Sequence, residues 1–509
     1  MNRSGRAAKG FVTAIAQYFI VSLSQILLAP FILRVAGAEV LGAYSFLMQI
    51  LGVGLLLDLG LSVALSRFLA RSYVDEKLSD DFFQFFRIGW YLVFCANILT
   101  GLLFMILGLY LGLFLEAEPE ILRDAKLFLY TLGVWYLVRT PLQIYVFAMH
   151  ATQNMSMSNY IQIAANLIRV VLVFVLISYE FGLLGMLVGY LSAEFIGMLW
   201  HRVWFRGYFY QAKWKKAPID KKKIRDLFSI GFKYWGVHFA QILGSGTDAL
   251  IVGKLFGAKY VAMIYLTKMP ALLGTQLIYK ISDNSGPAFN EIYANSSKIH
   301  IYETLCKILK ISAFIALPFS LGTIFFTDIV LGLWVGSNQY VGTLYVLGLG
   351  IVVVTQSLSH VYAMVVLASG NLNRWAPVTL MAGGFTCIGS FLLGKNFGLQ
   401  WIIIPAVLAE IFVCSWLVLR VRSIFHVSII VFLNDSLIGP LKSSFFLIIP
   451  FALSSYYLGE SNITAVMLIL HIVMLFLVWI YSVFYIGLIA DERVRMIKMI
   501  TTKISELKA

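Results

Sequence analysis

The chain has 509 residues, of which 60% are hydrophobic and 13% are charged, and its formal net charge is +14. Soluble domains are about 45–50% apolar and about 25% charged, so this composition excludes a water-soluble globule. Apolar runs of about 20 residues, the length that crosses a bilayer as a helix, recur along the whole chain. They lack the alternation of polar and apolar residues that is typical of barrel strands. We therefore predict an all-α polytopic membrane protein.

The first apolar run, from Phe11 to Val35, follows the basic leader "MNRSGRAAKG". It is longer than the apolar core of a secretory signal peptide, so we interpret it as a first span. The whole sequence predicts about fourteen transmembrane helices joined by short segments. They are 11–35, 41–66, 86–113, 122–149, 159–178, 182–201, 228–256, 260–284, 304–333, 341–368, 376–394, 399–419, 437–457 and 464–489.

Lys and Arg residues are unevenly distributed over the segments that connect these spans. They gather in every second segment, counted from the N-terminus, and are sparse in the others. This is the positive-inside pattern, which predicts that both termini are cytoplasmic and explains the net charge without a nucleic-acid partner. The largest basic block, "FRGYFYQAKWKKAPIDKKKIR" at 205–225, is interpreted as a linker that touches anionic lipid head groups.

One pair of stretches reveals an internal repeat. "FGLLGMLVGYLSAEFIGMLW" at 181–200 resembles "FGLQWIIIPAVLAEIFVCSW" at 397–416. Further matches at nearly the same spacing are "GA" at 37–38 and 257–258, "ATQN" at 151–154 with "ASGN" at 368–371, and Tyr145 with Tyr362.

The repeat predicts two six-helix halves, 1–205 and 227–425, joined by a basic cytoplasmic linker at 206–226. Two extra transmembrane helices and a basic cytoplasmic tail occupy 426–509. Because six is even, both halves enter the membrane in the same orientation, which gives a parallel pseudo-two-fold repeat. Transporters with such repeats bind substrate near the bilayer midplane, where the repeats meet.

The stretches "GAEVLGAYSFLMQILGVGLLLDLGLSVALSRFLA" (37–70) and "DALIVGKLFGAKYVAMIYL" (248–266) resemble Wzx-type polysaccharide flippases of the multidrug/oligosaccharidyl-lipid/polysaccharide exporter superfamily. The resemblance covers nearly the whole chain. It implies a flippase of the bacterial cytoplasmic membrane that moves an undecaprenyl-pyrophosphate-linked oligosaccharide to the outer leaflet by alternating access. The glycan would be an O-antigen, capsule or exopolysaccharide repeat unit. Membrane lipids, a polysaccharide polymerase and chain-length regulators are the implied partners.

Three alternatives remain open. Fourteen spans also occur in lipid II-type flippases of this superfamily, which carry a peptidoglycan precursor. The drug and cation antiporters of the superfamily usually have twelve spans and often a carboxylate in the first, where this chain has Gln17, Gln25 and Arg34. A membrane glycosyltransferase or polymerase would need catalytic residues on a sizeable outer loop. Because the outer loops are short, we predict a transporter rather than an enzyme, with no catalytic residues.

Ionisable residues within the spans are the candidate functional groups, because such residues face a bundle interior or water far more often than lipid. Arg and Lys suit the phosphates of a lipid-linked sugar. The candidate cavity cations are Arg139, Arg169, Lys268, Arg34 and Lys254, and the candidate coupling or ion-pair carboxylates are Asp58, Asp248, Glu194 and Glu410.

Each candidate also has a structural interpretation. Arg34 and Lys254 occupy equivalent span ends, where snorkelling to the interface competes with lining a cavity mouth. Arg139 and Arg169 lie nearer mid-depth, where substrate contact competes with a structural ion pair. For Lys268, deeper in its span, both roles stay open.

The carboxylates have their own alternatives. Asp58 and Asp248 would pair with these cations or take part in ion coupling. Glu194 and Glu410 are duplicated with the repeat, which favours a hydrogen bond to a neighbouring helix over proton coupling.

No cofactor or metal site is expected. The four cysteines are scattered, and the histidines of the bundle, His150, His201, His238 and His360, lack metal-ligand spacing, so packing or span-end roles are expected for them. Coupling to a proton or sodium gradient is the remaining expectation.

Overall fold

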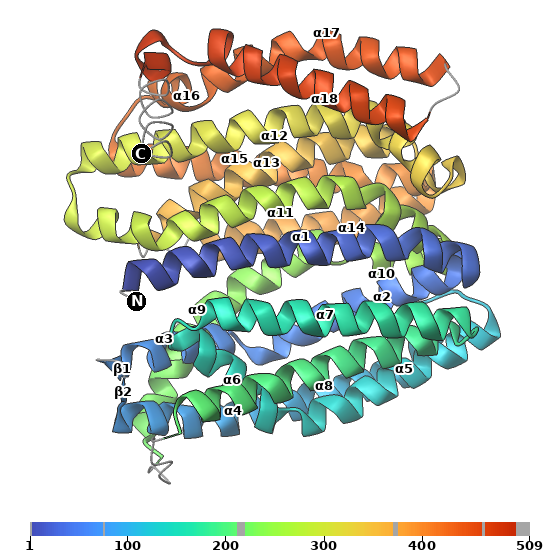
Figure 1. The fold of residues 1–509 in the computed structure, drawn as a ribbon, viewed down its shortest axis with the longest axis vertical. Coiled ribbons are helices and arrows are strands. Elements are labelled where there is room, and N and C mark those ends of the chain that lie inside the picture. Colours follow the sequence, from blue (N-terminus) through green and yellow to red (C-terminus); the bar gives the residue numbers. More distant parts are fainter. Residues whose placement is uncertain (1–2, 75–76, 211–218, 370–374, 461–463, 495–509) are drawn as a thin grey trace, which may run out of the picture. The chain divides into compact units, whose positions relative to one another are not determined.

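The computed structural model describes residues 3–74, 77–210, 219–369, 375–460 and 464–494. These residues are nearly all helical (Figure 1), and the strands among them are a short hairpin of β1 (Tyr73–Val74) and β2 (Lys77–Leu78). Twelve helices of the described chain are long and apolar enough to cross a membrane. The chain is therefore a multi-pass α-helical membrane protein, as predicted. Part of the basic linker, the end of "ASGN" and most of the basic tail lie outside the described residues.

The helices follow one another with short connections. Those of the first half are α1 (Arg3–Val35), α2 (Ala38–Gly54), α3 (Leu61–Arg71), α4 (Asp80–Leu109), α5 (Pro119–Val138), α6 (Thr140–Ala151), α7 (Met155–Ser178) and α8 (Gly182–Tyr208). Those of the second half are α9 (Lys221–Ser245), α10 (Asp248–Leu255), α11 (Ala258–Asn295), α12 (Lys298–Trp334), α13 (Thr343–Ala368), α14 (Trp375–Phe397) and α15 (Ile403–Phe425). The C-terminal helices are α16 (Ile429–Leu433), α17 (Gly439–Glu460) and α18 (Ala465–Ser482).

Three of the fourteen predicted spans are broken. The span predicted at 41–66 consists of α2 and α3, separated by a 3-10 turn and by Leu59 and Gly60, which both have positive φ. The other two are not among the twelve helices long and apolar enough to cross a membrane. The span predicted at 122–149 consists of α5 and α6, because Pro141 in the first turn of α6 cannot donate a backbone hydrogen bond and displaces the preceding turn. The span predicted at 228–256 consists of α9 and α10, separated at Gly246 and Thr247. Broken helices at membrane depth are found where backbone lines a protein-filled or watery interior.

The described helices form two compact units. The first comprises residues 1–265 and 373–402, and the second comprises 266–372 and 403–509. Within the first unit, α9 packs against α3 and α10 against α2, so helices from both sequence halves meet there. The division into domains at the repeat boundaries stays a prediction.

The same helix pairings recur in both halves of the sequence. In the first half, α1 packs against α7, α4 against α5, and α6 against α8. In the second half, α9 packs against α14, α12 against α13, and α13 against α15. These are matching pairs in the order of predicted spans, so the repeat seen in sequence is also a repeat of structure.

Two pairs of equivalent glycines show the repeat in backbone detail. Gly37 and Gly257 both have φ of 91°. Their amides donate to the carbonyls of Ile32 (3.2 Å) and Val252 (3.1 Å), which closes the preceding helix in the same way. Gly182 and Gly398, near the start of the two repeated stretches, also have positive φ. A left-handed backbone favours glycine, which explains why these positions share it.

The two extra helices belong to the second unit, where α17 contacts both α12 and α18. Trp479 donates to the Phe314 carbonyl (3.0 Å), and Lys310 pairs with Glu492 (2.6 Å). Apolar side chains such as Phe326 and Phe451 fill the space between α12 and α17. The prediction of two appended transmembrane helices is confirmed.

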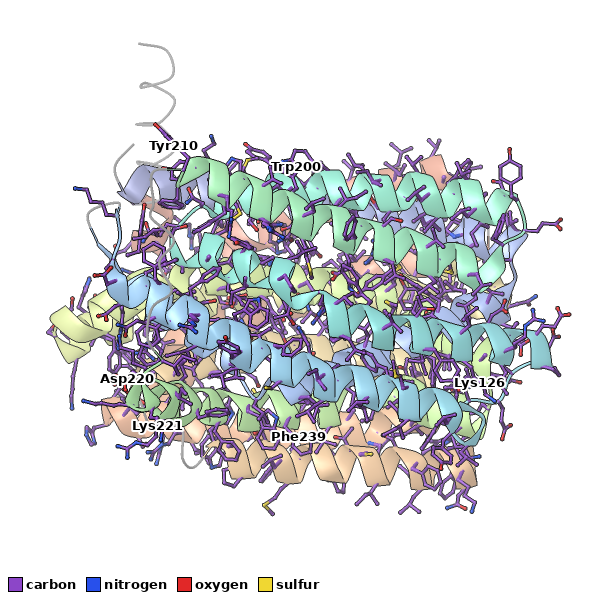
Figure 2. The ribbon with its side chains drawn as sticks, turned by 90° about the horizontal axis from the view of Figure 1, so that it is seen from below. Lys126, Trp200, Tyr210, Asp220, Lys221 and Phe239 are labelled. Carbon is purple, nitrogen blue, oxygen red and sulfur yellow. The ribbon has the colours of Figure 1, made fainter. Side chains whose placement is uncertain are left out.

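Within the first unit, the connections gather at opposite ends of the helices. Figure 2 shows Tyr210, Asp220 and Lys221, which flank the basic linker, at one end, and Lys126 of α5 at the other. The first of these is called the linker end below.

Candidate substrate-binding site

Arg139 lies at the break between α5 and α6, inside the first unit. It is only 5% exposed. Its guanidinium carbon lies 3.4 Å from the centre of the Tyr136 ring, and its Nη1 is 3.8 Å from Oε2 of Glu194 on α8. The break at Pro141 thus places a permanent cation among buried groups, next to a carboxylate from a different helix.

A network of amides surrounds this pair. Asn97 of α4 accepts a hydrogen bond from Nη2 of Arg139 (3.4 Å). Its own amide nitrogen donates to Thr140 (2.9 Å) and Gln143 (2.8 Å) on α6. Buried polar groups are normally fully satisfied, and this network joins α4, α6 and the helix break into one polar centre.

The pair itself is incompletely hydrogen-bonded. At 3.8 Å the contact between Arg139 and Glu194 is ionic but too long for a hydrogen bond. Nε of Arg139 and Oε2 of Glu194 are buried atoms with no hydrogen-bond partner. A guanidinium with an unused N–H can donate a hydrogen bond to an anionic oxygen, and binding of a phosphate here stays a prediction.

Arg169 on α7 adds a second cation to the same region. Its Nη2 donates to Asn166 (2.7 Å), whose amide in turn donates to Ser24 on α1 (3.0 Å). The Arg169 charge also acts on Glu194 and on Tyr44 of α2. The structure therefore gathers three of the predicted site residues, the two arginines and Glu194, in one part of the bundle.

The other predicted cations lie apart from this centre or in the second unit. Arg34 and Lys254 are exposed in the last turns of α1 and α10, where a cation also favours the negative end of the helix dipole. Lys268 is half-buried in the part of α11 that belongs to the second unit. Their role as cavity cations stays a prediction.

Asp58 and Asp248 lie at helix starts. Asp58 accepts from the Ser62 amide (3.0 Å) in the first turn of α3. Asp248 accepts from the Ala249 amide (2.9 Å) and from the side chain of Gln49 on α2 (2.8 Å). These contacts tie the two carboxylates to nearby backbone amides and to α2. They do not test the predicted roles as cation partners or in ion coupling.

Glu410 on α15 accepts a hydrogen bond from Gln356 on α13 (2.9 Å). The sequence separation between Arg139 and Gln356 equals that between the repeated tyrosines, Tyr145 and Tyr362. Gln356 and Arg139 therefore occupy equivalent positions in the repeat. In each half, therefore, the repeated glutamate contacts the residue at the same position of the repeat on a neighbouring helix. The partner is a cation in the first half and a neutral amide in the second, so at this position of the repeat only the first half carries a permanent positive charge.

Sequence reasoning missed Asn97, Gln143 and Gln356. Single amides in apolar runs do not reveal which side of a helix they occupy. For Gln356 the available signal was the spacing of the repeat, because it aligns that residue with Arg139.

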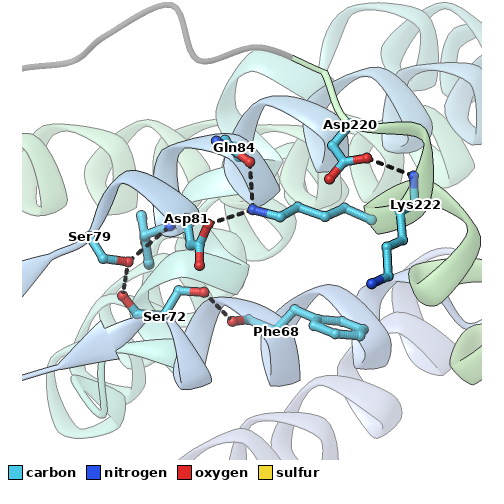
Figure 3. Close-up of polar contacts among 9 residues, drawn as sticks. Phe68, Ser72, Ser79, Asp81, Gln84, Asp220 and Lys222 are labelled. Carbon is cyan, nitrogen blue, oxygen red and sulfur yellow. Dashed lines mark hydrogen bonds and ion pairs between the residues drawn. The ribbon is translucent and has the colours of Figure 1, made fainter.

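A separate pocket of about 530 Å³ opens at the linker end of the first unit. Figure 3 shows polar contacts among residues of this region, including Ser72, Asp81 and Asp220. Lys223 of α9 binds both Asp81 and Gln84 of α4 at 2.5 Å, which ties these helices together. The lining residues are Phe68, Arg71, Ser72, Ser79, Asp81, Phe85, Asp220, Lys222, Lys223 and Asp226. Its three cationic and three acidic side chains balance, so this pocket offers a phosphate no net attraction.

Comparison with known proteins identifies the family. The profile of a family described as "Polysaccharide biosynthesis protein" matches residues 37–344, which is more than half of the chain. The chain belongs to this polysaccharide biosynthesis protein family. Among curated proteins, none matches the chain.

Solved structures of transporters share the fold of this family member. One described as "Inward-facing conformation of a multidrug resistance MATE family transporter of the MOP superfamily" has a TM-score of 0.63 and 14% identity, covering 81% of this chain and 96% of that one. "Lipid II flippase MurJ, inward closed conformation" has a TM-score of 0.63 and 16% identity, covering 92% and 97%. "Structure of MATE multidrug transporter DinF-BH in complex with R6G" has a TM-score of 0.61 and 16% identity, covering 84% and 98%. The fold expected from the resemblance to this superfamily is confirmed.

Proposed function

We propose that this protein is a flippase that moves an undecaprenyl-pyrophosphate-linked oligosaccharide from the cytoplasmic to the outer leaflet of a bacterial cytoplasmic membrane by alternating access. The observation that carries the proposal is the buried, incompletely bonded guanidinium of Arg139 in a polysaccharide biosynthesis family member with a transporter fold. A pyrophosphate loses its hydration when it leaves water, and only paired charge or hydrogen bonds offset that loss.

The arrangement around Arg139 suits both parts of such a head group. The guanidinia of Arg139 and Arg169 offer charge to the phosphates. The amides of Asn97 and Gln143, together with Tyr136, are the kinds of group that bind hydroxyls and stack against sugar rings. The transporters and flippases among the solved structures with this fold support a transporter rather than an enzyme.

The second candidate is a flippase for the peptidoglycan precursor lipid II. It is favoured by the larger share of this chain, 92%, that superposes on the lipid II flippase, compared with 81% on the inward-facing drug transporter. Both candidates carry a polyprenyl pyrophosphate, so they need the same cations and differ in the glycan. A drug or cation antiporter is less well supported, because α1 contains no Asp or Glu.

The proposal places the linker and both termini in the cytoplasm, on the strength of the Lys and Arg distribution. We expect a thiol reagent that cannot cross membranes to label a cysteine at Ser337, after α12, but not one at Lys221, at the start of α9. Both positions are exposed, and the experiment uses a variant that lacks the four native cysteines. Labelling of Lys221→Cys in intact cells would show that the linker faces outward and would contradict the proposed orientation.

Deleting the gene tests the function in cells. We expect the surface polysaccharide to disappear while a complete lipid-linked oligosaccharide accumulates, because the sugars are assembled before the flipping step. Mass spectrometry of extracted lipids measures the glycan. A truncated glycan would instead identify a glycosyltransferase, and normal glycan with altered drug or cation efflux would identify an antiporter.

A further inference from the structure

The second half has titratable side chains where the first half has fixed charge and amides. His360 on α13 is equivalent to Gln143 in the repeat, at the same spacing that relates Gln356 to Arg139. His360 lies one helical turn beyond Gln356, which binds Glu410. The repeat therefore replaces an arginine and a glutamine by a glutamine and a histidine at corresponding positions.

His360 makes a defined contact with a second helix. Its Nε2 lies 2.7 Å from Oδ1 of Asp283 on α11, and a carboxylate only accepts, so Nε2 carries the donated hydrogen. The imidazole stacks on Tyr279 of α11, with ring centres 4.0 Å apart and planes inclined by 16°. The side chains of His360 and Asp283 are 28% and 56% exposed, so protons can reach them.

Few other charges act on this pair among the described residues. On α11, Lys280 lies one turn from Asp283, and Tyr279 is influenced by both Asp283 and Glu410 of α15. On α15, Cys414 lies one turn beyond Glu410. The charged side chains of α12, which packs along α13, are directed elsewhere: Lys310 to Glu492, Asp328 to its neighbouring amide, and Glu303 and Lys307 to the exposed surface.

Protonation changes the strength of this link between helices. Histidine ordinarily changes charge between about pH 5 and 8. An added proton enters at Nδ1, converts the hydrogen bond between a neutral imidazole and the carboxylate into an imidazolium–carboxylate pair, and strengthens it. A conformation in which α11 and α13 separate would lose that partner and release the proton. By linkage, acidification then favours the conformation in which the pair is closed.

We propose that His360 and Asp283 form the proton-binding site that couples movement of the second half to a proton gradient, an inference that rests on the proposed flippase function. Arg139 and its neighbours hold the anionic substrate in the first half, and the titratable pair responds to protons in the second. Substrate binding would thus belong to the fixed cation of the first half, and proton binding to the titratable pair of the second half.

The test uses the full-length protein inserted in one orientation in vesicles that contain the lipid-linked oligosaccharide, with and without a gradient of about one pH unit. A fully coupled single proton shifts the ratio of the lipid between leaflets by up to about tenfold. We expect this shift for wild type and for His300→Gln, a matched control at an exposed histidine at the start of α12. We expect no shift for His360→Gln or Asp283→Asn, although both should still equilibrate the lipid without a gradient.

The outcomes separate the inference from the proposed function. A gradient-dependent shift in His360→Gln, or no shift in a wild-type protein that equilibrates the lipid, would overturn the inference and leave the flippase intact. If wild type does not move the lipid at all, the proposed function fails and the inference fails with it. If His360→Gln does not fold, Asp283→Asn decides alone, because it keeps the histidine and removes the charge.

Discussion

Arg139→Gln should reduce transport by about 30-fold or more while the protein still folds and inserts. Removing one member of a buried charge pair costs about 2–5 kcal/mol of binding, and about 2 kcal/mol corresponds to about 30-fold. Surface polysaccharide in cells and flipping in vesicles measure the loss. Arg123→Gln is the matched control, since Arg123 is an exposed arginine on the same α5 that pairs with its neighbour Asp124. It should behave as wild type.

Glutamine is chosen because the protein already contains that arrangement. Gln356 and Glu410 show that a glutamine at this position forms a hydrogen bond with the repeated glutamate. Arg139→Ala would instead leave Glu194 buried without a partner, which destabilises the folded protein by about 3–5 kcal/mol. A loss of transport could then not be distinguished from a loss of folded protein. If Arg139→Gln folds and transports normally, the ion pair is structural and the substrate does not need this cation. If Arg139→Gln is lost from the membrane, the double variant with Glu194→Gln provides the folded protein for the same measurement.

The sequence was sufficient to predict the membrane class and the repeat, because both are visible as local patterns of residues along the chain. It also singled out Arg139, which is buried, but Arg34 and Lys254 are exposed. A run of apolar residues indicates a transmembrane span by itself, and Glu194 and Glu410 are conspicuous as charged residues within such runs. The breaks were not predicted, although Pro141 and the glycines near 246 were visible. Proline and glycine occur in intact transmembrane helices as well, where neighbouring groups satisfy the backbone.

The site could not be predicted in full, because its geometry depends on which helices cross. Arg139 and Glu194 are far apart in sequence and meet only because α6 packs against α8. Asn97 contributes from α4, and nothing in its apolar surroundings distinguishes a network member from an isolated amide. The link between His360 and Asp283 depends likewise on side chains of α11 and α13 meeting there.

The purified protein should move a lipid-linked oligosaccharide between leaflets without any other protein. This movement should depend on the buried charge of Arg139. Crossing the hydrocarbon without a protein requires the pyrophosphate and sugars to lose water with nothing in return. A membrane potential negative inside would favour outward movement by about 2.3 kcal/mol per unit charge per 100 mV. The protein therefore needs only to provide a polar path.

Reconstitution in vesicles measures this directly. The undecaprenyl-pyrophosphate-linked oligosaccharide is placed in both leaflets, and a glycosidase added outside reports how much glycan becomes accessible. We expect digestion to stop near one half in protein-free vesicles and to approach completion with wild type. With Arg139→Gln, digestion beyond one half should be about 30-fold slower than with wild type. Wild-type vesicles that also stop near one half, with folded protein present, would contradict the account.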